Sequence, residues 1–482
     1  MRLLIAVRFR DCISRLALCA APLITGCSLI QVTPGPPPEA KLIAAYVVVG
    51  ENGMASARAI TAESPLATCP VIKIDGTTQR MQVRAPAATI PQRPTASTIA
   101  NSKPSAFPVM TCEFSLPANT ASAIVGDIAL RLPKANPQRI VVLADTGCRM
   151  KAADNAWQPC VDEEAWPFRP ISELAAAMAP DLVVHIGDFH YRENACPPHV
   201  TGCQGSPWGY GWDTWQADLF DPAAKLLAAA PWVVARGNHE ECRRAGQGWF
   251  RFLDAQAFSE ARSCNDAAND AIGNFSQPYA VPLSADLQLI IFDSAVAGDK
   301  PLDLAKPRDA HTLSQYRQQF ATVDALARKP GVNSIFINHH PILGFSSDET
   351  RRVFAGNPAL MSAMKPMHPQ RYYPPSVNLA LHGHVHLFQA INFSSSHPAT
   401  VVTHAGGSQT YPNFPDPFPT GLVAAEGITL ESITHGNQFG FAVMDKRETD
   451  WQLSVYNHRG TVLTTCMLIG SKVRCDKAGL LK

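Results

Sequence analysis

The sequence predicts an α/β protein in which helices cover largely parallel sheets, with a smaller β-rich domain in front. After residue 136, apolar runs rich in Val, Ile and Leu alternate with segments of helical periodicity, as in sheets that are buried on both faces. From residue 41 to 135, short apolar runs are separated by Pro, Thr, Ser and Asn, without long helical periodicity. We therefore expect an N-terminal domain at 41–135 and a larger domain at 136–482.

The apolar runs give the expected elements in order. Four runs in the N-terminal domain predict short strands, at 42–49, 71–74, 81–83 and 124–132. In the larger domain we expect helices at 171–178, 222–230 and 313–328, between strands at 140–144, 182–186, 232–235, 287–292, 334–337 and 377–381. Four later runs are expected to close the fold as antiparallel strands, at 400–404, 439–444, 451–456 and 462–468.

The composition allows a large core but identifies no partner. The chain has 482 residues, of which 46% are hydrophobic and 17% are charged. Its net charge of +1 indicates neither a basic stripe nor an acidic tail, so nucleic acid is not an expected partner. Partners must therefore be inferred from a site, and the oligomeric state is left open.

Residues 1–26 are typical of an export signal. Four arginines precede an apolar stretch at 16–24 that is too short to be a stable membrane anchor. The stretch ends at Ile24–Thr25–Gly26–Cys27, which resembles a bacterial lipoprotein signal and implies a cell-envelope protein anchored by lipid on Cys27. Cleavage after Ala20 or Ala21, which would give a periplasmic or secreted protein, is the alternative. Residues 27–40 are Pro-rich and fit a stiff tether.

The cysteine content agrees with export. Ten cysteines remain after the signal and Cys27 are set aside, and an even number in an exported chain implies disulfides. Sequence alone leaves their connectivity open, but nearest-neighbour pairing would close five local loops. A structural zinc site is the weaker alternative, because no two of them have the close spacing of zinc ligands. The ten are Cys69, Cys112, Cys148, Cys160, Cys196, Cys203, Cys242, Cys264, Cys466 and Cys475.

Five short motifs rich in Asp, Asn and His begin where predicted strands end. Ligands of open α/β sheets collect beyond the carboxyl ends of the strands, so we expect these motifs to converge. Carboxylate oxygens and imidazoles in one place suit a hydrolytic site with two metal ions. The motifs are Ala144–Gly147, Gly187–Tyr191, Gly237–Glu240, Asn338–Pro341 and His382–His386.

In their order and character the five motifs resemble the calcineurin-like metallophosphoesterase superfamily, over roughly residues 139–404. The nearest resemblance is to purple acid phosphatases, because Gly147 follows Asp145 by two residues and Tyr191 follows Asp188 by three. Ala144 stands where those enzymes usually have glycine. The resemblance implies a β-sandwich flanked by helices.

The resemblance also implies an activity, the hydrolysis of small-molecule phosphomonoesters by in-line attack of a hydroxide that bridges two metal ions. Phosphodiesterase or nucleotide pyrophosphohydrolase activity is an alternative that the same centre supports. A non-catalytic surface lipoprotein is a third interpretation. Retention of the whole motif set argues against it, because a binding module has no use for an attacking water.

Carried onto this chain, the resemblance implies two ligand sets that share Asp188. A phenolate ligand implies Fe³⁺ in the first set and a divalent Fe, Zn or Mn ion in the second. His239 is expected to face the substrate as a catalytic residue, with Glu240 orienting it. The first set is Asp145, Asp188, Tyr191 and His386, and the second is Asp188, Asn238, His339 and His384.

Several neighbouring residues remain ambiguous. His190 is an alternative to Tyr191 as a ligand, and His340 could lie behind the ligands, face the substrate or simply pack. His404 is a candidate for lining the pocket. Structural roles are expected for His185, His382 and Asp293. An aromatic insert either forms its own small core or stacks on a nucleoside or sugar; it contains Trp208, Tyr210, Trp212 and Trp215.

Overall fold

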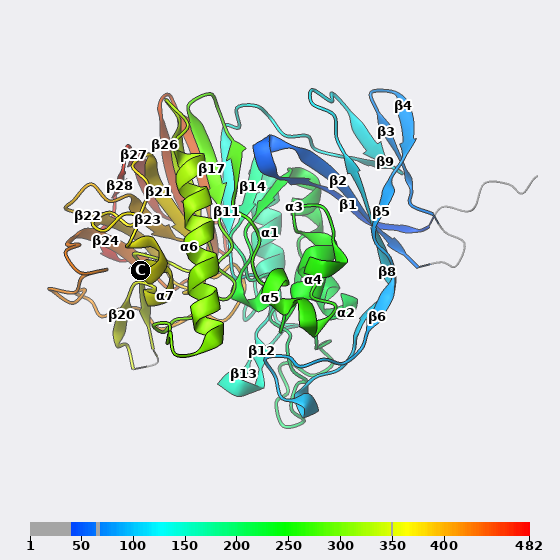
Figure 1. Ribbon diagram of the computed structural model, residues 1–482, viewed down its shortest axis with the longest axis horizontal. Coiled ribbons are helices and arrows are strands. Elements are labelled where there is room, and N and C mark those ends of the chain that lie inside the picture. Colours follow the sequence, from blue (N-terminus) through cyan, green and yellow to red (C-terminus); the bar gives the residue numbers. More distant parts are fainter. Residues whose placement is uncertain (1–39, 64–67, 349) are drawn as a thin grey trace, which may run out of the picture. The chain divides into compact units, whose positions relative to one another are not determined.

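The computed structural model describes residues 40–63, 68–348 and 350–482 (Figure 1). The expected export signal, the lipid site at Cys27 and all but the last residue of the tether lie outside these residues. Within the described ranges, no helix combines the length and the apolar character needed to cross a bilayer.

Two large sheets form the centre of the fold, and each contains a block of parallel strands. The first sheet, in spatial order, consists of β28 (Lys472–Cys475), β27 (Val462–Ile469), β26 (Asp450–Asn457), β25 (Gly440–Arg447), β11 (Arg139–Leu143), β14 (Leu182–His185), β15 (Trp232–Val234), β1 (Leu42–Val49), β2 (Ala55–Ala62), β8 (Val109–Ser115) and β5 (Gln82–Ala85). The second consists of β16 (Tyr279–Pro282), β17 (Leu287–Ile291), β18 (Asn333–Ile337), β21 (Val377–His382), β23 (Ala399–Val402), β22 (Phe388–Phe393), β24 (Leu430–Gly436) and β29 (Gly479–Leu480).

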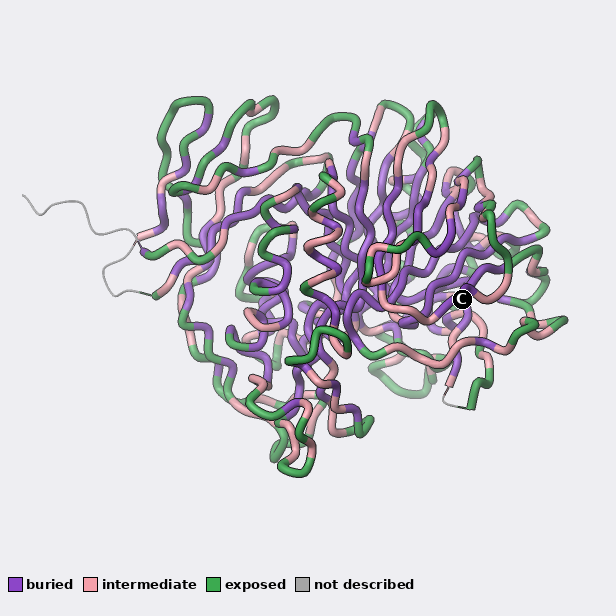
Figure 2. The backbone as a smooth tube through the Cα atoms, turned by 180° about the vertical axis from the view of Figure 1, so that it is seen from behind, coloured by how far each residue is buried: buried purple, intermediate pink, exposed green. Residues whose placement is uncertain are grey.

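The two sheets share one apolar core, which makes the sandwich. Ile140, Val142 and Val184 of the first sheet belong to the same buried cluster as Ile335 and Leu379 of the second. Figure 2 shows buried backbone concentrated in the strands of both sheets, with exposed residues gathered at the loops. β11, β14 and β15 run parallel, as do β17, β18 and β21. The sandwich flanked by helices that the sequence predicts is confirmed.

Helices cover the outer faces of both sheets (Figure 1). A second core joins α1 (Phe168–Ala177), α3 (Ala224–Ala229) and α4 (Gly246–Phe252) to the first sheet, and a third joins α6 (Pro307–Ala327) and α7 (Pro358–Met364) to the second. The predicted helices at 171–178, 222–230 and 313–328 correspond to α1, α3 and α6. α4 was not predicted, because it is buried on every side and has no amphipathic pattern.

The β-rich N-terminal region is present, and part of it extends the first sheet. β1 lies parallel to β15, with Val48 paired to Trp232, and β2, β8 and β5 follow outward. A separate four-stranded sheet consists of β10 (Ile128–Ala129), β9 (Ala123–Val125), β3 (Val71–Ile74) and β4 (Thr77–Arg80). The domain boundary near residue 136 stays a prediction.

The closing strands follow the prediction with one difference. β25, β26 and β27 are antiparallel as expected. β23, expected as an antiparallel strand at 400–404, runs parallel to β21 and antiparallel to β22. The sequence prediction missed β22, so it could not place β23 between a parallel and an antiparallel neighbour.

Five disulfides join the ten cysteines by nearest-neighbour pairing. Three of them close loops that directly follow the Asp145, Asp188 and Asn238 motifs. Disulfides of this number indicate an oxidising compartment. The pairs are Cys69–Cys112, Cys148–Cys160, Cys196–Cys203, Cys242–Cys264 and Cys466–Cys475.

Candidate metal centre

The five motifs converge at the carboxyl ends of strands from both sheets. β11, β14 and β15 lead into Asp145, Asp188 and Asn238, while β18 and β21 lead into His339 and the His384–His386 turn. Three groups of possible metal ligands result among the described residues, and in each group the donor atoms lie within 4.8 Å of one another. The first, Asp145–Asp188–His386, and the second, Asp188–His339–His384, share Asp188, whereas the third, Asp299–His340–His384, shares His384 with the second.

Tyr191 lies in contact with all three residues of the first group. Its hydroxyl lies 2.8 Å from Asp188 Oδ2, 3.1 Å from Asp145 Oδ1 and 2.7 Å from His386 Nε2. All four residues are buried. Burial, together with the Asp188 and Asp145 carboxylates, raises the pKa of Tyr191 well above its ordinary value. A strongly charged cation is therefore required to make this phenol a phenolate ligand.

The second group is nearer to solvent. His339 Nε2 lies 3.0 Å from Asp188 Oδ2, and the other ring nitrogen, Nδ1, donates to the Ile186 carbonyl at 2.7 Å. This hydrogen bond fixes which nitrogen faces the group. Asn238 Oδ1 lies 3.0 Å from His384 Nδ1, and both residues are half-buried. A solvent-borne ligand therefore reaches the centre most directly at this group.

The turns that carry the ligands hold unusual backbone conformations. Asp145, Asp188, His384 and His386 have φ of 55°, 57°, 73° and 51°, in the left-handed region that costs a residue other than glycine about 1–3 kcal/mol. Gly187 precedes Asp188 with φ of 89°, and a Cβ there would lie 2.6 Å from the Gly237 nitrogen. Such strain persists only where the surrounding contacts impose it, which is typical of functional sites.

Gly147 leaves room for the Tyr191 backbone. A Cβ at Gly147 would lie 2.8 Å from both Tyr191 N and Asp218 Oδ2. The buried Asp218 carboxylate accepts from Tyr191 N at 2.8 Å and from Cys148 N at 3.0 Å. The sequence analysis missed Asp218, which belongs to the aromatic insert and has no motif spacing to the ligands. Through these hydrogen bonds the Asp218 carboxylate fixes the backbone at Tyr191.

The structure brings Tyr191, rather than its neighbour His190, to the ligand cluster. The His190 ring packs against Tyr210 and Trp215, with centroids 5.6 and 5.8 Å away. Tyr210, Trp212 and Trp215 are buried in the core between helices and sheet. These three rings therefore belong to the core that the helices share with the first sheet, neither to a separate core of the insert nor to an exposed stacking surface, while Trp208 packs half-buried against the cluster that contains Cys148 and Cys160.

His239 lies over Tyr191 and is held by two residues that the sequence analysis missed. The ring centroids of His239 and Tyr191 are 3.8 Å apart. His239 Nδ1 lies 2.9 Å from Glu193 Oε1, and Arg244 Nη2 lies 2.9 Å from His239 Nε2. Arg244 also pairs with Glu193. Burial and the Arg244 charge lower the pKa of His239 to about 3, so this imidazole is neutral at neutral pH.

Glu240 occupies a different place from the one expected. Its carboxylate accepts hydrogen bonds from the backbone amides of Asp188 at 2.9 Å, Phe189 at 2.8 Å, His190 at 3.1 Å and Gly237 at 3.1 Å. Among the described residues, no hydrogen bond joins it to the His239 ring, because the Glu240 side chain turns back into the Gly187–Tyr191 turn. Glu240 therefore supports the turn that carries Asp188, and Glu193 is the carboxylate beside His239.

Asp299 and His340 form the third group with His384, outside the ligand set expected from the sequence. Asp299 Oδ1 lies 3.0 Å from His384 Nε2, opposite the nitrogen that faces Asn238. The His340 ring lies 4.1 Å from the His384 ring, and its Nδ1 lies 3.1 Å from Ser294 Oγ. His340 thus lies against His384, within the third group. No motif contains Asp299, so sequence reasoning had no signal for it.

The remaining histidines lie away from the ligand cluster. His185 Nε2 lies 3.0 Å from Thr146 Oγ1, and His382 Nδ1 donates to the Asn338 carbonyl at 3.1 Å. His404 is fully buried and stacks on Phe388 with ring centroids 4.9 Å apart. These contacts fit packing roles for all three histidines.

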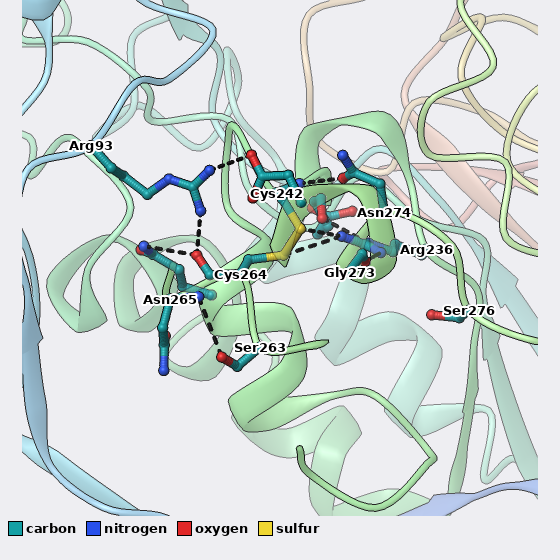
Figure 3. The surroundings of a disulfide bond; sticks show 12 residues. Arg93, Arg236, Cys242, Ser263, Cys264, Asn265, Gly273, Asn274 and Ser276 are labelled. Carbon is teal, nitrogen blue, oxygen red and sulfur yellow. Dashed lines mark hydrogen bonds and ion pairs between the residues drawn. A yellow bond between two sulfur atoms is a disulfide. The ribbon is translucent and has the colours of Figure 1, made fainter. Parts of the chain in front are cut away.

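Arg236 links the Glu240 backbone to Asp293 and to the Cys242–Cys264 disulfide. Figure 3 shows its guanidinium directed at the Cys242–Cys264 disulfide, with Nη2 3.9 and 3.7 Å from the two sulfurs. Its Nε donates to the Glu240 carbonyl at 2.8 Å, and Nη1 lies 3.3 Å from Asp293 Oδ2. Asp293 also accepts from the backbone amides of residues 276 and 295, so its expected structural role fits these contacts.

This fold and ligand cluster define a hydrolase of the metal-binding phosphoesterase class. The family model described as calcineurin-like phosphoesterase matches residues 138–388, and the chain belongs to that family. It is a metal-dependent phosphoesterase, and the family and fold imply a centre with two metal ions. No curated protein matches the sequence.

Two solved structures are similar to this chain at low sequence identity. A purple acid phosphatase from yellow lupin seeds is 16% identical, with a TM-score of 0.53, over 88% of this chain and 74% of the lupin chain. A dimetal phosphatase from Danio rerio is 13% identical, with a TM-score of 0.37, over 70% of this chain and all of the other. At this identity the lupin structure supports the fold alone.

Proposed function

We propose that the protein hydrolyses small-molecule phosphomonoesters at a binuclear metal centre. The observation that supports this most directly is the pair of ligand groups that share Asp188, each with its donor atoms within 4.8 Å. Asp145, Tyr191 and His386 would complete the first site, and Asn238, His339 and His384 the second. Two ions held there would neutralise phosphate charge and activate water.

The donor chemistry fits the metals expected from the sequence. Carboxylates and a phenolate are hard anionic oxygen donors, which suit Fe³⁺ at the Tyr191 site. An amide oxygen and two imidazoles suit a divalent Fe, Zn or Mn ion at the other. Purified protein should hold close to two metal ions and absorb visible light. A colourless, active protein with two ions would exclude iron at Tyr191 and keep the enzyme.

Tyr191→Phe separates the roles of the two sites. The variant keeps the ring over which His239 lies but lacks the oxygen donor, so it should lose the visible band and the first ion. It should retain the second ion, because Tyr191 is not among the ligands proposed for it. Metal analysis of both proteins, folded and dialysed in parallel, measures this. A visible band that survives in Tyr191→Phe would contradict the assignment.

Next to the ligands, His239 is the residue we propose to act on the substrate, either by stabilising phosphoryl charge or, once the charge of the bound phosphate has raised the pKa of its ring, by protonating the leaving oxygen. Its ring lies over Tyr191, and the Glu193–Arg244 pair positions it. His239→Ala should lose most turnover of p-nitrophenyl phosphate while keeping two ions. A variant with unchanged turnover would remove His239 from the mechanism.

We also propose that the protein is exported and carries lipid on Cys27. The five disulfides support an oxidising compartment, while the segment that would carry the lipid lies outside the described residues. Metabolic labelling with a radioactive fatty acid should mark the full chain and spare Cys27→Ala. If neither protein is labelled, the enzyme is free in the periplasm or the medium.

A further inference from the structure

A polar cavity of about 590 Å³ lies beside the first ligand group. Tyr411, in its wall, has its ring centroid 5.3 Å from that of His386. The neighbouring Gln409 carbonyl accepts a hydrogen bond from His386 Nδ1 at 2.5 Å. One wall of the cavity is therefore in direct contact with a proposed metal ligand, at the side of the ring that faces away from the ligand cluster.

Both walls of this cavity are anchored on the Asp145 turn. The segment that contains Arg149 is closed by the Cys148–Cys160 disulfide, directly after that turn. The opposite segment is held because Ser408 N donates to the Asp145 carbonyl at 2.9 Å. The walls are thus fixed relative to the proposed metal ligands.

A buried glutamine, Gln158, also joins the two walls. Its Oε1 accepts from Arg149 N at 2.9 Å and from Gln409 N at 3.2 Å, while its Nε2 donates to the Gly407 carbonyl at 2.7 Å. A cavity whose walls are held together in this way is pre-organised, and binding there loses little free energy to ordering the protein.

The lining of the cavity is polar with its charges compensated. The Arg149 guanidinium donates to Asp154 at 2.7 Å and to the Tyr411 hydroxyl at 3.0 Å. If the substrate carried another phosphate besides the one at the metal ligands, that phosphate would have to compete with Asp154 for the Arg149 guanidinium. The other polar side chains of the lining are neutral amides and a hydroxyl, which bind alcohol groups in either donor or acceptor direction; they are Asn155, Gln409, Asn437 and Thr410.

A second cavity, of about 450 Å³, adjoins the first. The two share Asn155 and Gln409 in their lining, and the second adds the half-buried rings of Trp157 and Phe439. Trp157 is held by a hydrogen bond from its Nε1 to Asn155 Oδ1 at 3.2 Å. Planar polar groups around an aromatic face complement a ring that carries hydroxyls at its edge and C–H groups on its face.

We propose that these two cavities bind the leaving group of the substrate, and that this leaving group is a sugar. The inference rests on the proposed function, since it takes the phosphate to lie at the metal ligands. A long aliphatic alcohol would leave the amides of the first cavity unpaired, and an anionic alcohol would face Asp154. A hexose phosphate satisfies the polar wall and places its ring toward Trp157.

The test compares two substrates that differ only in the leaving group. Glucose 6-phosphate offers hydroxyls to the cavity, whereas p-nitrophenyl phosphate does not. In the double variant Asn155→Ala, Gln409→Ala, the ratio of kcat/KM for the sugar phosphate to that for the aryl phosphate should fall about 5-fold or more, because each lost hydrogen bond is worth a factor of about 2 to 10. Gln318→Ala, an exposed glutamine on α6, is the matched control and should keep the ratio.

The possible outcomes distinguish failure of the proposed sugar site from failure of the proposed phosphomonoesterase function. A fallen ratio in the double variant, with an unchanged ratio in the control, supports a sugar site. Equal losses on both substrates, or no change, would overturn the sugar site while leaving the phosphatase intact. If the metal-loaded wild type hydrolyses neither substrate, the proposed phosphomonoesterase function fails before the cavity is tested. A preference for another phosphomonoester that the double variant does not alter would also overturn the sugar site.

Discussion

Replacing Glu240 tests whether the Asp188 turn depends on one buried carboxylate. Oε1 accepts from two backbone amides and Oε2 from two others, and all four donors belong to the Gly187–Tyr191 turn or to Gly237. Glu240→Gln keeps the acceptor on one side but turns an amide N–H₂ toward two N–H donors. Glu240→Ala removes all four acceptors and leaves a cavity that water can partly fill.

The magnitude follows from the number of donors that lose a partner. An unsatisfied buried donor costs about 1–3 kcal/mol, so the two donors affected in Glu240→Gln cost about 2–6 kcal/mol. Four donors in Glu240→Ala would cost about 4–12 kcal/mol if water did not enter. Domains are stable by about 5–15 kcal/mol, so the alanine variant is at risk of not folding and the glutamine variant carries the test.

Urea unfolding of the chelator-treated protein, followed by tryptophan fluorescence, measures the change without a contribution from metal binding. Glu241→Gln is the matched control, because this neighbour makes a single distant ion pair, 3.9 Å from Arg308. We expect Glu240→Gln to lose at least about 2 kcal/mol relative to that control. Equal stability of the two glutamine variants would refute the argument that Glu240 holds the turn.

Three further outcomes follow from single contacts. Asp299→Asn should weaken the second ion by about 10–100-fold in a chelator competition, because the carboxylate fixes the ring of His384; an unchanged affinity would contradict this role. Removing the Cys242–Cys264 disulfide, which closes a loop with a sequence separation of 22, should lower the free energy of unfolding by about 3 kcal/mol in urea titrations, and a loss near zero would contradict the estimate. Burial lowers the pKa of His404 to about 3, so the unfolded chain binds a proton there first as pH falls below about 6.5, and stability is lost from that pH downward. His404→Leu should therefore lose about 2–3 kcal/mol less than the wild type between pH 7 and pH 4.5, and equal losses would show that His404 is not the group responsible.

The proposed ligands could be found from sequence because each one follows a strand that is visible as an apolar run. Asp145 comes directly after β11 and its flanking Ala144, and His339 lies two residues after β18. Residues that follow parallel strands lie at the same edge of the sheet, so their convergence can be predicted without knowing the conformations of the loops. The sandwich could be predicted for the same reason, since its strands are the most apolar segments of the chain.

The contacts that orient these ligands could not be found in this way. Glu193 and Arg244 reach His239 from loops on either side of the aromatic insert, and Asp299 reaches His384 from the loop after β17. Loop polar residues carry no periodicity, so nothing in the sequence distinguishes them from ordinary surface charges. The helix α4 was missed because it is buried on every side and lacks an amphipathic pattern, and α7 was missed because its seven residues are too few to establish a helical period.

The sequence analysis expected Glu240 beside His239, whereas the structure places Glu193 there. Proximity along the chain therefore did not identify the side chain that contacts the His239 ring. Glu240 is adjacent to His239 in sequence, but adjacent side chains in a tight turn point in different directions, and this one turns back to four backbone amides. Glu193 is distant in sequence, and although burial raises the pKa of a carboxyl, the Arg244 guanidinium holds the pKa of Glu193 well below its ordinary value, so it stays ionised beside the imidazole. The two buried carboxylates therefore have different roles. Glu240 holds the backbone turn that carries Asp188, and Glu193 holds the His239 ring, which we propose to contact the substrate. Glu193→Gln should consequently lower turnover with little loss of metal, whereas Glu240→Gln should weaken metal binding and stability together.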